Sequence, residues 1–205
     1  MIEVSLRSRV VAQFGHPRGA LGWLAGRIML SRGSNRNRTR WAVSMLDPLP
    51  TESILEIGFG PGYALELLAA RAFRGLVAGV DHSELMVNVA RRRTRRAPCP
   101  VELRCAPVSE LPDFGVAFDK VLAVNCFQFW PDPVMDLAAV RQLMRPDGLI
   151  ALVIQPRNPG ATAATTKALG DRLRGYLGEA GFKAIRLELN EALTPVPAVA
   201  ALARA

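Results

Sequence analysis

The chain has few cysteines, and they form no pattern. Cys99, Cys105 and Cys126 are odd in number and include no C-x-x-C pair, which argues against a disulfide framework and against a zinc site. No other spacing typical of metal ligands is present, so we expect no metal. Without a disulfide framework, the sequence predicts a reducing, cytoplasmic setting.

Long apolar runs are also missing. The longest one near the start, residues 20–30, is interrupted by Arg27 and is far too short to span a bilayer. No cleavage-site pattern follows it, so we expect no targeting segment and no transmembrane segment. At 205 residues the chain can bury a core without cross-links, and one globular domain is the default expectation.

Acidic residues are outnumbered, with 18 against 26 basic residues and a net charge of +8. Such a balance is compatible with RNA or a lipid surface as a partner. Arginine supplies all but three of the basic residues, however, and GC-rich coding produces the same bias. The basic run at residues 91–96 lies where a helix should end, and cations there are stabilised by the helix dipole without any partner. It also lacks interleaved aromatic side chains, so a nucleic acid is the less favoured partner.

One stretch carries most of the functional signal. Residues 54–57 form a short apolar run, typical of a parallel strand covered on both faces, in which Glu56 is the one charge. Three glycines follow at every second position, Gly58, Gly60 and Gly62. They allow the backbone to turn tightly and to approach a ligand without Cβ atoms in the way. We therefore expect a strand, a ligand-binding turn and the start of a helix.

The spacing of these glycines separates two kinds of nucleotide site. A dinucleotide site has G-x-G-x-x-G, whereas this chain has E-x-G-x-G-x-G, with Tyr63 where the third glycine of a dinucleotide site would stand. At these residues the sequence resembles the class I S-adenosylmethionine-dependent methyltransferases, whose first motif is an acidic residue followed by G-x-G-x-G. The resemblance implies S-adenosyl-L-methionine as cofactor and S-adenosyl-L-homocysteine as product, with the methionine end and the ribose over the glycines.

A second strand, expected at residues 75–80, ends in Asp81. In a Rossmann-type sheet an acidic residue at this point holds a ribose, because a carboxylate can accept hydrogen bonds from both hydroxyls. We expect Asp81 to take that role, the alternative being that it caps the next helix, and His82 to lie beside the adenosine. Ser83 is a good cap for that helix, whose buried side chains should be Leu85, Met86, Val89 and Ala90.

Two further strands are expected at residues 101–105 and 118–124. The segment after the first of these resembles the family's third motif, in which an acidic side chain meets the adenine amino group. Here Pro107 stands at that position, so the backbone would recognise the ring edge. The loop after the other strand begins at Asn125 and faces the reaction, because ligands bind outside the carboxyl ends of parallel strands. Its aromatic residues would wall the substrate pocket or pack in the core: Phe127, Phe129 and Trp130.

The remaining pattern completes an α/β fold. A turn at residues 145–148, with Asp147 where the family commonly has glycine, precedes a fifth strand at residues 149–154, and two short strands follow near the C-terminus. We predict a Rossmann-like, doubly wound seven-stranded sheet, mostly parallel, with an antiparallel C-terminal edge pair. Residues 51–205 would form the methyltransferase core.

Residues 1–50 are expected to form helices that act as an N-terminal lid over the cofactor pocket. This segment resembles the front part of a group of small bacterial methyltransferases. Within it, residues 19–30 could instead form a core-packing helix or a membrane-interface helix. A further helix should begin after Gly33, bury Trp41, Ala42, Met45 and Leu46, and end before Pro48.

The predicted cofactor site joins the residues of these motifs: Glu56, Gly58, Phe59, Gly60, Gly62, Asp81, His82, Met86, Ala106, Pro107, Val108 and Asn125. No catalytic residue is predicted, because a sulfonium methyl group is already activated and the protein mainly has to align a nucleophile and exclude water. The base candidates are each without a partner visible in the sequence: His16, Tyr63, His82 and Cys126.

The predicted function is methyl transfer to a small-molecule acceptor. The loops after the fourth and fifth strands are short, and no RNA-binding domain is appended. RNA or protein methylation stays open as an alternative, as do a non-catalytic S-adenosylmethionine-binding module and a nicotinamide enzyme. The acceptor, the atom methylated and the oligomeric state are not determined by the sequence.

Overall fold

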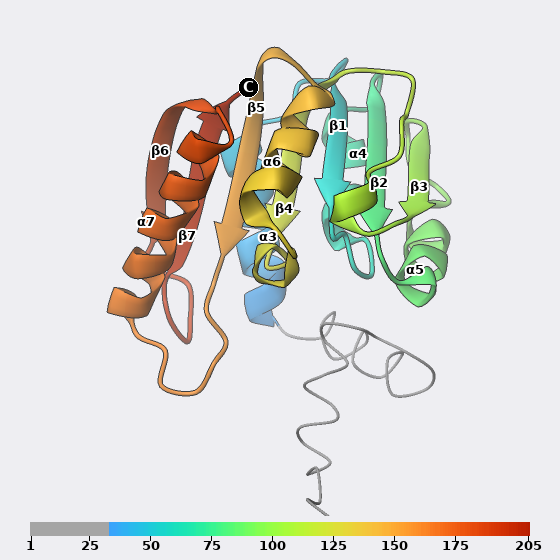
Figure 1. Ribbon diagram of the computed structural model, residues 1–205. Helices are drawn as coiled ribbons and strands as arrows, with labels where there is room; N and C mark the ends of the chain where they lie inside the picture. The colour runs from blue at the N-terminus through green and yellow to red at the C-terminus, as the bar shows by residue number, and fades with distance from the viewer. Residues whose placement is uncertain (1–32) are drawn as a thin grey trace, which may run out of the picture.

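A seven-stranded sheet forms the centre of the structure, a computed structural model that describes residues 33–205 (Figure 1). The strands lie in the order β3-β2-β1-β4-β5-β7-β6. The first five are parallel, and β7 runs antiparallel between β5 and β6. The predicted fold class is therefore confirmed. The strand bounds are β1 Ser53–Ile57, β2 Leu76–Asp81, β3 Val101–Cys105, β4 Phe118–Val124, β5 Met144–Ile154, β6 Lys183–Asn190 and β7 Ala198–Arg204.

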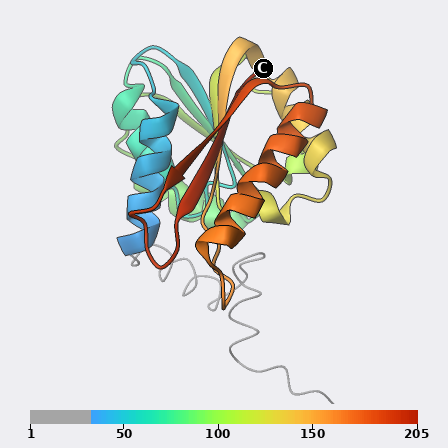
Figure 2. The same cartoon turned by 90° about the vertical axis from the view of Figure 1, so that its left-hand side faces the viewer.

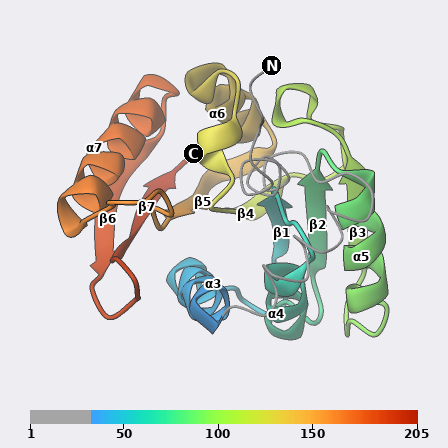
Figure 3. The same cartoon turned by 90° about the horizontal axis from the view of Figure 1, so that it is seen from below.

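Helices cover both faces of the sheet (Figure 3). One face carries α3, Gly33–Leu46, α4, Tyr63–Arg71, and α5, Glu84–Thr94. The other carries α6, Pro133–Gln142, and α7, Ala163–Glu179. Two short 3-10 turns, η1 at Val108–Glu110 and η2 at Phe127–Phe129, follow β3 and β4. This is the three-layer arrangement that a buried parallel sheet requires.

The alternation of side chains along β1 determines which face of the sheet Glu56 lies on. Ile54 packs in the core between the sheet and α3 and α4, whereas Leu55 and Ile57 pack in the core on the α6 and α7 side. Because successive side chains in a strand point to opposite faces, Glu56 shares the face of Ile54. Its carboxyl group is therefore buried against the start of α4, where the backbone of Leu65 hydrogen-bonds to it.

The helix α5 starts as predicted and buries two of the four predicted side chains, Met86 and Ala90. Ser83 caps it, accepting a hydrogen bond from the backbone N–H of Met86. The buried side chains are Met86, Val87, Ala90 and Thr94, while Leu85 and Val89 are only half-buried. Ala90 lies directly against Gly62, where an added Cβ would be 2.8 Å from that of Ala90. This contact places Ala90 at the centre of the buried face of α5.

The turn predicted at residues 145–148 is instead part of a longer strand. β5 runs without interruption from Met144 to Ile154. Its pairing with β4 shifts from Phe118 opposite Met144 to Lys120 opposite Leu149, so the extra residues bulge out. Asp147 lies in this bulge with φ 63°, a left-handed conformation that glycine adopts most easily and that Asp tolerates better than most residues. That geometry explains why glycine suits this position.

α3 belongs to the layered core as well as to the predicted lid segment. Ala42, Val43 and Leu46 are buried, and Trp41 and Met45 pack against the same cluster, close to the face that was predicted. The helix contacts α4, β4, β5 and β7, and Figure 2 shows it on the opposite side of the sheet from α7. The predicted boundary between residues 50 and 51 stays a prediction, because residues 1–32 of the lid segment lie outside the described residues.

No helix within residues 33–205 has the length and apolar character needed to cross a membrane.

Two glycine substitutions test how tightly the layers pack. At Gly75, before β2, an added Cβ would lie 2.0 Å from the carbonyl oxygen of Glu52, whereas at Gly175, in α7, it would meet nothing within 4 Å. We expect Gly75→Ala to lower the free energy of unfolding by about 1–3 kcal/mol or more, because backbone must move. Gly175→Ala should raise it by about 0.5–1 kcal/mol, because alanine favours a helix over glycine. Urea denaturation measures both, and a neutral Gly75→Ala would contradict the packing described.

Candidate cofactor and acceptor site

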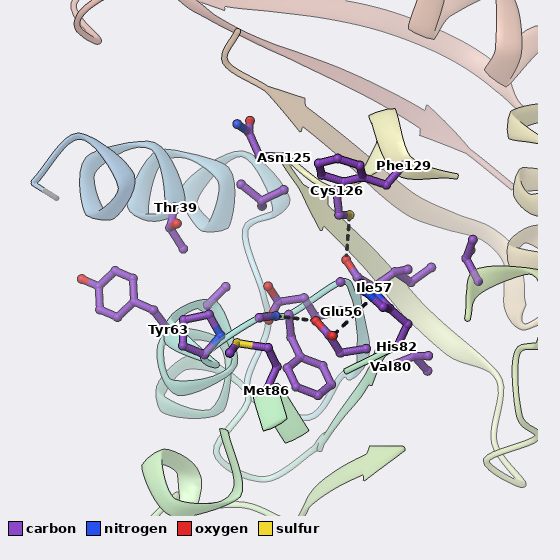
Figure 4. A pocket seen from close by; sticks show the side chains of 18 of the residues that line it. Thr39, Glu56, Ile57, Tyr63, Val80, His82, Met86, Asn125, Cys126 and Phe129 are labelled. Carbon is purple, nitrogen blue, oxygen red and sulfur yellow. Dashed lines mark hydrogen bonds and ion pairs between the residues drawn. The ribbon is translucent and has the colours of Figure 1, made fainter. Parts of the chain in front are cut away.

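A cavity of about 370 Å³ opens at the carboxyl ends of β1, β2 and β4 (Figure 4). The strand order reverses here, since β1 leads to β2 on one side and β4 lies on the other. Open α/β sheets bind ligands at such a switch point. The first two turns of α3 close one side of the cavity, through Asn35, Arg36, Arg38 and Thr39.

The glycine loop forms the floor of the cavity. Gly58 has φ 69°, and its N–H donates to the carbonyl of Val80 at 2.7 Å. An added Cβ there would lie 2.5 Å from the Cβ of Cys126. Gly60 has φ 52°, but an added Cβ would meet no atom of residues 33–205 within 4 Å. Gly58 is therefore required by the packing of the loop, and Gly60 leaves open the space in which a ligand would lie.

Gly62 has a structural role at the start of α4. It is the N-cap residue of α4 with φ 80°, and it allows Ala90 of α5 to approach closely. It does not line the cavity. Of the twelve residues predicted to bind the cofactor, Gly62 is the exception, and the other eleven all line the cavity. Whether those eleven bind the cofactor stays a prediction.

Asp81 ties the glycine loop to β2. Its Oδ2 accepts the N–H of Gly60 at 2.8 Å, and its Oδ1 accepts the N–H of Ser83 at 2.9 Å. Because α5 is capped by Ser83, the alternative of Asp81 as the helix cap is wrong. Burial raises the pKa of Asp81, and hydrogen bonds from Ser83 and Gly60 and the nearby His82 oppose that shift. Each carboxylate oxygen can accept a further hydrogen bond, which suits the predicted ribose contact.

Glu56 is a buried carboxyl group with an unused acceptor. It is 3% exposed, and its Oε2 has no hydrogen-bond partner within the described residues. Burial raises its pKa well above the ordinary value, the charge of Asp81 raises it further, and the backbone hydrogen bond from Leu65 lowers it. A cationic ligand group would stabilise this carboxylate. S-adenosylmethionine carries such a group, the ammonium of its methionine part, so Glu56 fits that cofactor.

The lining around the carboxyl ends of β2 and β3 is mostly apolar. Phe59, Val80, Met86, Ala106, Pro107 and Val108 line it, with His82 at the surface. Glu56 and Asp81 are the only acids among the described residues that line the cavity. Pro107 itself has no side-chain group for an adenine amino group, and recognition of the ring edge by the backbone around Pro107 stays a prediction.

The loop after β4 forms the other side of the cavity. Asn125 joins the ends of β4 and β5, because its side chain both donates to the carbonyl of Gln155 and accepts the N–H of Gln155. The thiol of Cys126 donates to the carbonyl of Ile57 at 3.1 Å, and burial raises its pKa to about 12. Cys126 therefore cannot serve as a base near neutral pH. Of the other base candidates, Tyr63 and His82 line the cavity, and His16 lies outside the described residues.

Two of the three predicted aromatic wall residues line the cavity. Phe129, which is 54% exposed, and Trp130 do so. Phe127 is buried in the core instead, with its ring 4.8 Å from that of Trp130 and 5.8 Å from that of Tyr176. In the 3-10 turn η2 and its C-cap, Phe127 and Trp130 stand three residues apart and so lie on one side, where their rings pack together, whereas Phe129 points away and is exposed.

The sequence analysis missed three residues of α3 that line the cavity, Arg36, Arg38 and Thr39. A signal for Arg38 was present, because it lies four and eight residues before Ala42 and Leu46 and so shares their buried helix face. An arginine in line with an apolar stripe indicates a buried cation. Within the described part of the chain, no group of three or more His, Cys, Asp or Glu residues could hold a metal ion.

Comparison with known proteins is consistent with this site. Residues 54–148 match the profile of the family described as Methyltransferase domain. The chain is 30% identical over 181 residues to YdaC, an uncharacterized methyltransferase of Bacillus subtilis, and covers 97% of YdaC and 88% of its own length. The chain belongs to the class I S-adenosylmethionine-dependent methyltransferases. This methyltransferase therefore uses S-adenosylmethionine as its cosubstrate.

More distant relatives share the fold or part of the chain. The methyltransferase is 30% identical over 118 residues to a ubiquinone biosynthesis O-methyltransferase of Cereibacter sphaeroides, covering 57% of its own length and 47% of that enzyme. It spans about half the length of that relative. A SAM-dependent methyltransferase from Aquifex aeolicus has the same fold, with a TM-score of 0.67, 19% identity and coverage of 85% and 94% of the two chains.

A paired substitution tests whether the space above Gly60 holds the cofactor. Gly60 and Gly115 both have positive φ and open space where a Cβ would be added, but only Gly60 lines the cavity. We expect each alanine variant to lose about 1 kcal/mol of stability. Gly60→Ala should also weaken S-adenosylhomocysteine binding at least about tenfold, while Gly115→Ala leaves it unchanged. Calorimetry measures the affinities, and equal values for both variants would refute the assignment.

Glu56 makes cofactor affinity depend on pH. Its raised pKa means that the free protein protonates it at a higher pH than an exposed glutamate. Contact with an ammonium group requires the ionised form. S-adenosylhomocysteine should therefore bind more weakly as the pH falls through that pKa, by up to about tenfold per pH unit below it. Glu56→Gln should bind weakly with a shallower pH dependence, the remainder coming from Asp81, whose pKa is also raised, and His82→Gln should keep the slope. A flat profile for the unsubstituted protein in calorimetry would rule out the contact.

Proposed function

We propose that this methyltransferase acts on a small-molecule acceptor. The observation that carries the proposal is the shape of the site: one cavity of about 370 Å³ joins the predicted cofactor residues to a wall formed by Phe129, Trp130 and α3. That volume lies at the lower end of the range for small-molecule sites. A wall of two aromatic side chains suits an acceptor with an apolar or aromatic body.

The relatives support the same proposal. A partial relative is by name an O-methyltransferase of ubiquinone biosynthesis, which acts on a small molecule. The predicted lid over this site stays part of the proposal, supported by the α3 residues that line the cavity.

The division of chemical roles follows from the residues. S-adenosylmethionine supplies a methyl group that its sulfonium already activates. Glu56 and Asp81 bind and orient the cofactor, and Trp130, which is 8% exposed, excludes water from the acceptor side. Among the described residues on that side, Asn125 is engaged by Gln155 and Cys126 stays protonated. The acceptor atom should therefore be a nucleophile without help from a strong base.

A second candidate, methylation of RNA, is favoured by one cluster that the sequence did not reveal. The guanidinium groups of Arg36, Arg40 and Arg93 lie 5.6, 6.0 and 5.9 Å from the centre of the Tyr63 ring, beside the cavity. Cations combined with an aromatic ring are typical of nucleic-acid sites. Arg93 is also paired with Glu66 at 2.9 Å, which reduces the charge available to a phosphate.

The molecules that receive a labelled methyl group distinguish a small-molecule acceptor from RNA. Incubation of the protein with methyl-labelled S-adenosylmethionine and a cell extract should label the fraction below about 1 kDa, the size range that a cavity of this kind admits. Prior digestion of RNA and protein in the extract should leave that label intact, and Gly60→Ala should reduce it. Label confined to RNA and lost after ribonuclease treatment would replace the small-molecule proposal by the RNA candidate.

A further inference from the structure

Arg38 is a buried cation that has no anionic partner among residues 33–205. Its side chain lines the cavity and is 7% exposed. Its Nη1 donates to the Oε1 of Gln155 at 3.1 Å, and its Nε is buried with no hydrogen-bond partner in that part of the chain. Burial lowers its pKa to about 9, and the charge of Arg157 contributes to that shift. A buried charge of this kind is costly unless an anion joins it.

The partner that Arg38 does have is held rigidly. Gln155 donates through Nε2 to the carbonyl oxygens of Thr194 and Val196, at 3.1 and 2.7 Å. Its Oε1 is thereby directed toward the arginines, and Arg157 donates to the same atom at 2.9 Å. Arg38 and Arg157 thus share one neutral amide oxygen, and Gln155 holds the guanidinium of Arg38 at a defined position in the wall of the cavity.

This site lies on the acceptor side of the cavity. Gln155 directly follows β5, and β4 separates β5 from β1, whose end carries the glycine loop. Neighbouring strands are about 4.8 Å apart, so two strand spacings, roughly 10 Å, separate Gln155 from the glycine loop. In Figure 4, Asn125 lies between α3 and Phe129, away from Glu56 and His82. The acids of the cavity lie at β1 and β2, and Arg38 lies across from them.

We propose that Arg38 binds a carboxylate of the methyl acceptor, so that the substrate is a small organic acid with an apolar or aromatic body. This rests on the proposed function. The edge of the guanidinium formed by Nε and Nη2 makes no hydrogen bond within the described residues, and such an edge binds both oxygens of a carboxylate. A dianionic phosphate is less suitable, because Glu56 and Asp81 already place two acids in the same cavity. Phe129 and Trp130 would contact the body of the acid.

The methionine carboxylate of the cofactor is the alternative ligand for Arg38. The affinities of the protein for two nucleosides distinguish this carboxylate from that of the acceptor. S-adenosylhomocysteine has that carboxylate, and 5′-methylthioadenosine lacks the whole amino-acid part. Arg38→Met removes the charge and keeps an apolar stem, and Arg92→Met, at an exposed position of α5 outside the cavity, is the control. Both variants should bind S-adenosylhomocysteine within about threefold of the unsubstituted protein. A loss above about tenfold for Arg38→Met, with unchanged methylthioadenosine binding, would assign Arg38 to the cofactor and overturn the proposal.

Direct binding of acids tests the acceptor contact itself. Benzoate, phenylacetate and cinnamate are titrated by NMR into the protein loaded with S-adenosylhomocysteine, each against its neutral amide. At least one acid should bind about tenfold more tightly than its amide, and Arg38→Met should abolish that preference while Arg92→Met keeps it. If Arg38→Met does not fold, Arg38→Lys should retain only part of the preference. No binding of any acid up to about 10 mM, or a preference that survives in Arg38→Met, would overturn the inference.

The two proposals fail in different ways. Transfer of methyl groups only to neutral small molecules would leave the proposed function standing and refute the carboxylate contact. Methyl label found only in RNA or protein would refute the proposed function, whatever the result of the acid titrations.

Discussion

The two hydrogen bonds that Asp81 accepts from backbone N–H groups organise the site. One comes from Gly60 in the loop after β1, and the other from Ser83 at the start of α5. A single carboxylate therefore joins two strand ends, the glycine loop and a helix cap. The loop depends on it, because the left-handed conformations of Gly58 and Gly60 cost glycine little and leave the chain flexible, so the hydrogen bond from Gly60 to Asp81 is what fixes the loop to β2. Weakening Asp81 would loosen every element that forms the floor of the cavity.

The charges of the cavity are separated along the sheet. Glu56 and Asp81 are buried at the ends of β1 and β2, and burial raises the pKa of both. Arg38 is buried at the other side, held by Gln155 at the end of β5, and burial lowers its pKa. Each group is kept in an environment that disfavours its own charge. Such a cavity stabilises ligands that bring a cation to one end and an anion to the other.

The three glycines of the motif serve different structural purposes. The three glycines of the loop look equivalent in the sequence, yet Gly58 contacts Cys126, Gly60 faces open space and Gly62 contacts Ala90. All three have positive φ, which is the property that a short motif reports. What each glycine makes room for depends on the segment that folds against it. Gly62, which was predicted to bind the cofactor, lies outside the lining of the cavity for that reason.

The sequence by itself determined where most of the strands lie along the chain, the glycine loop that follows the first of them, and the place of Asp81 at the end of the second. These features are local: an apolar run, a turn that needs glycine and a cap lie within a few residues of one another, and their physical causes act over the same distance. Tertiary structure alone decided that Phe127 packs in the core while Phe129 faces the cavity, and which face of α5 is buried. It also decided that Arg38 meets Gln155 across 117 residues of sequence. Such pairs form only when the layers of the domain pack together, and no spacing along the chain records them.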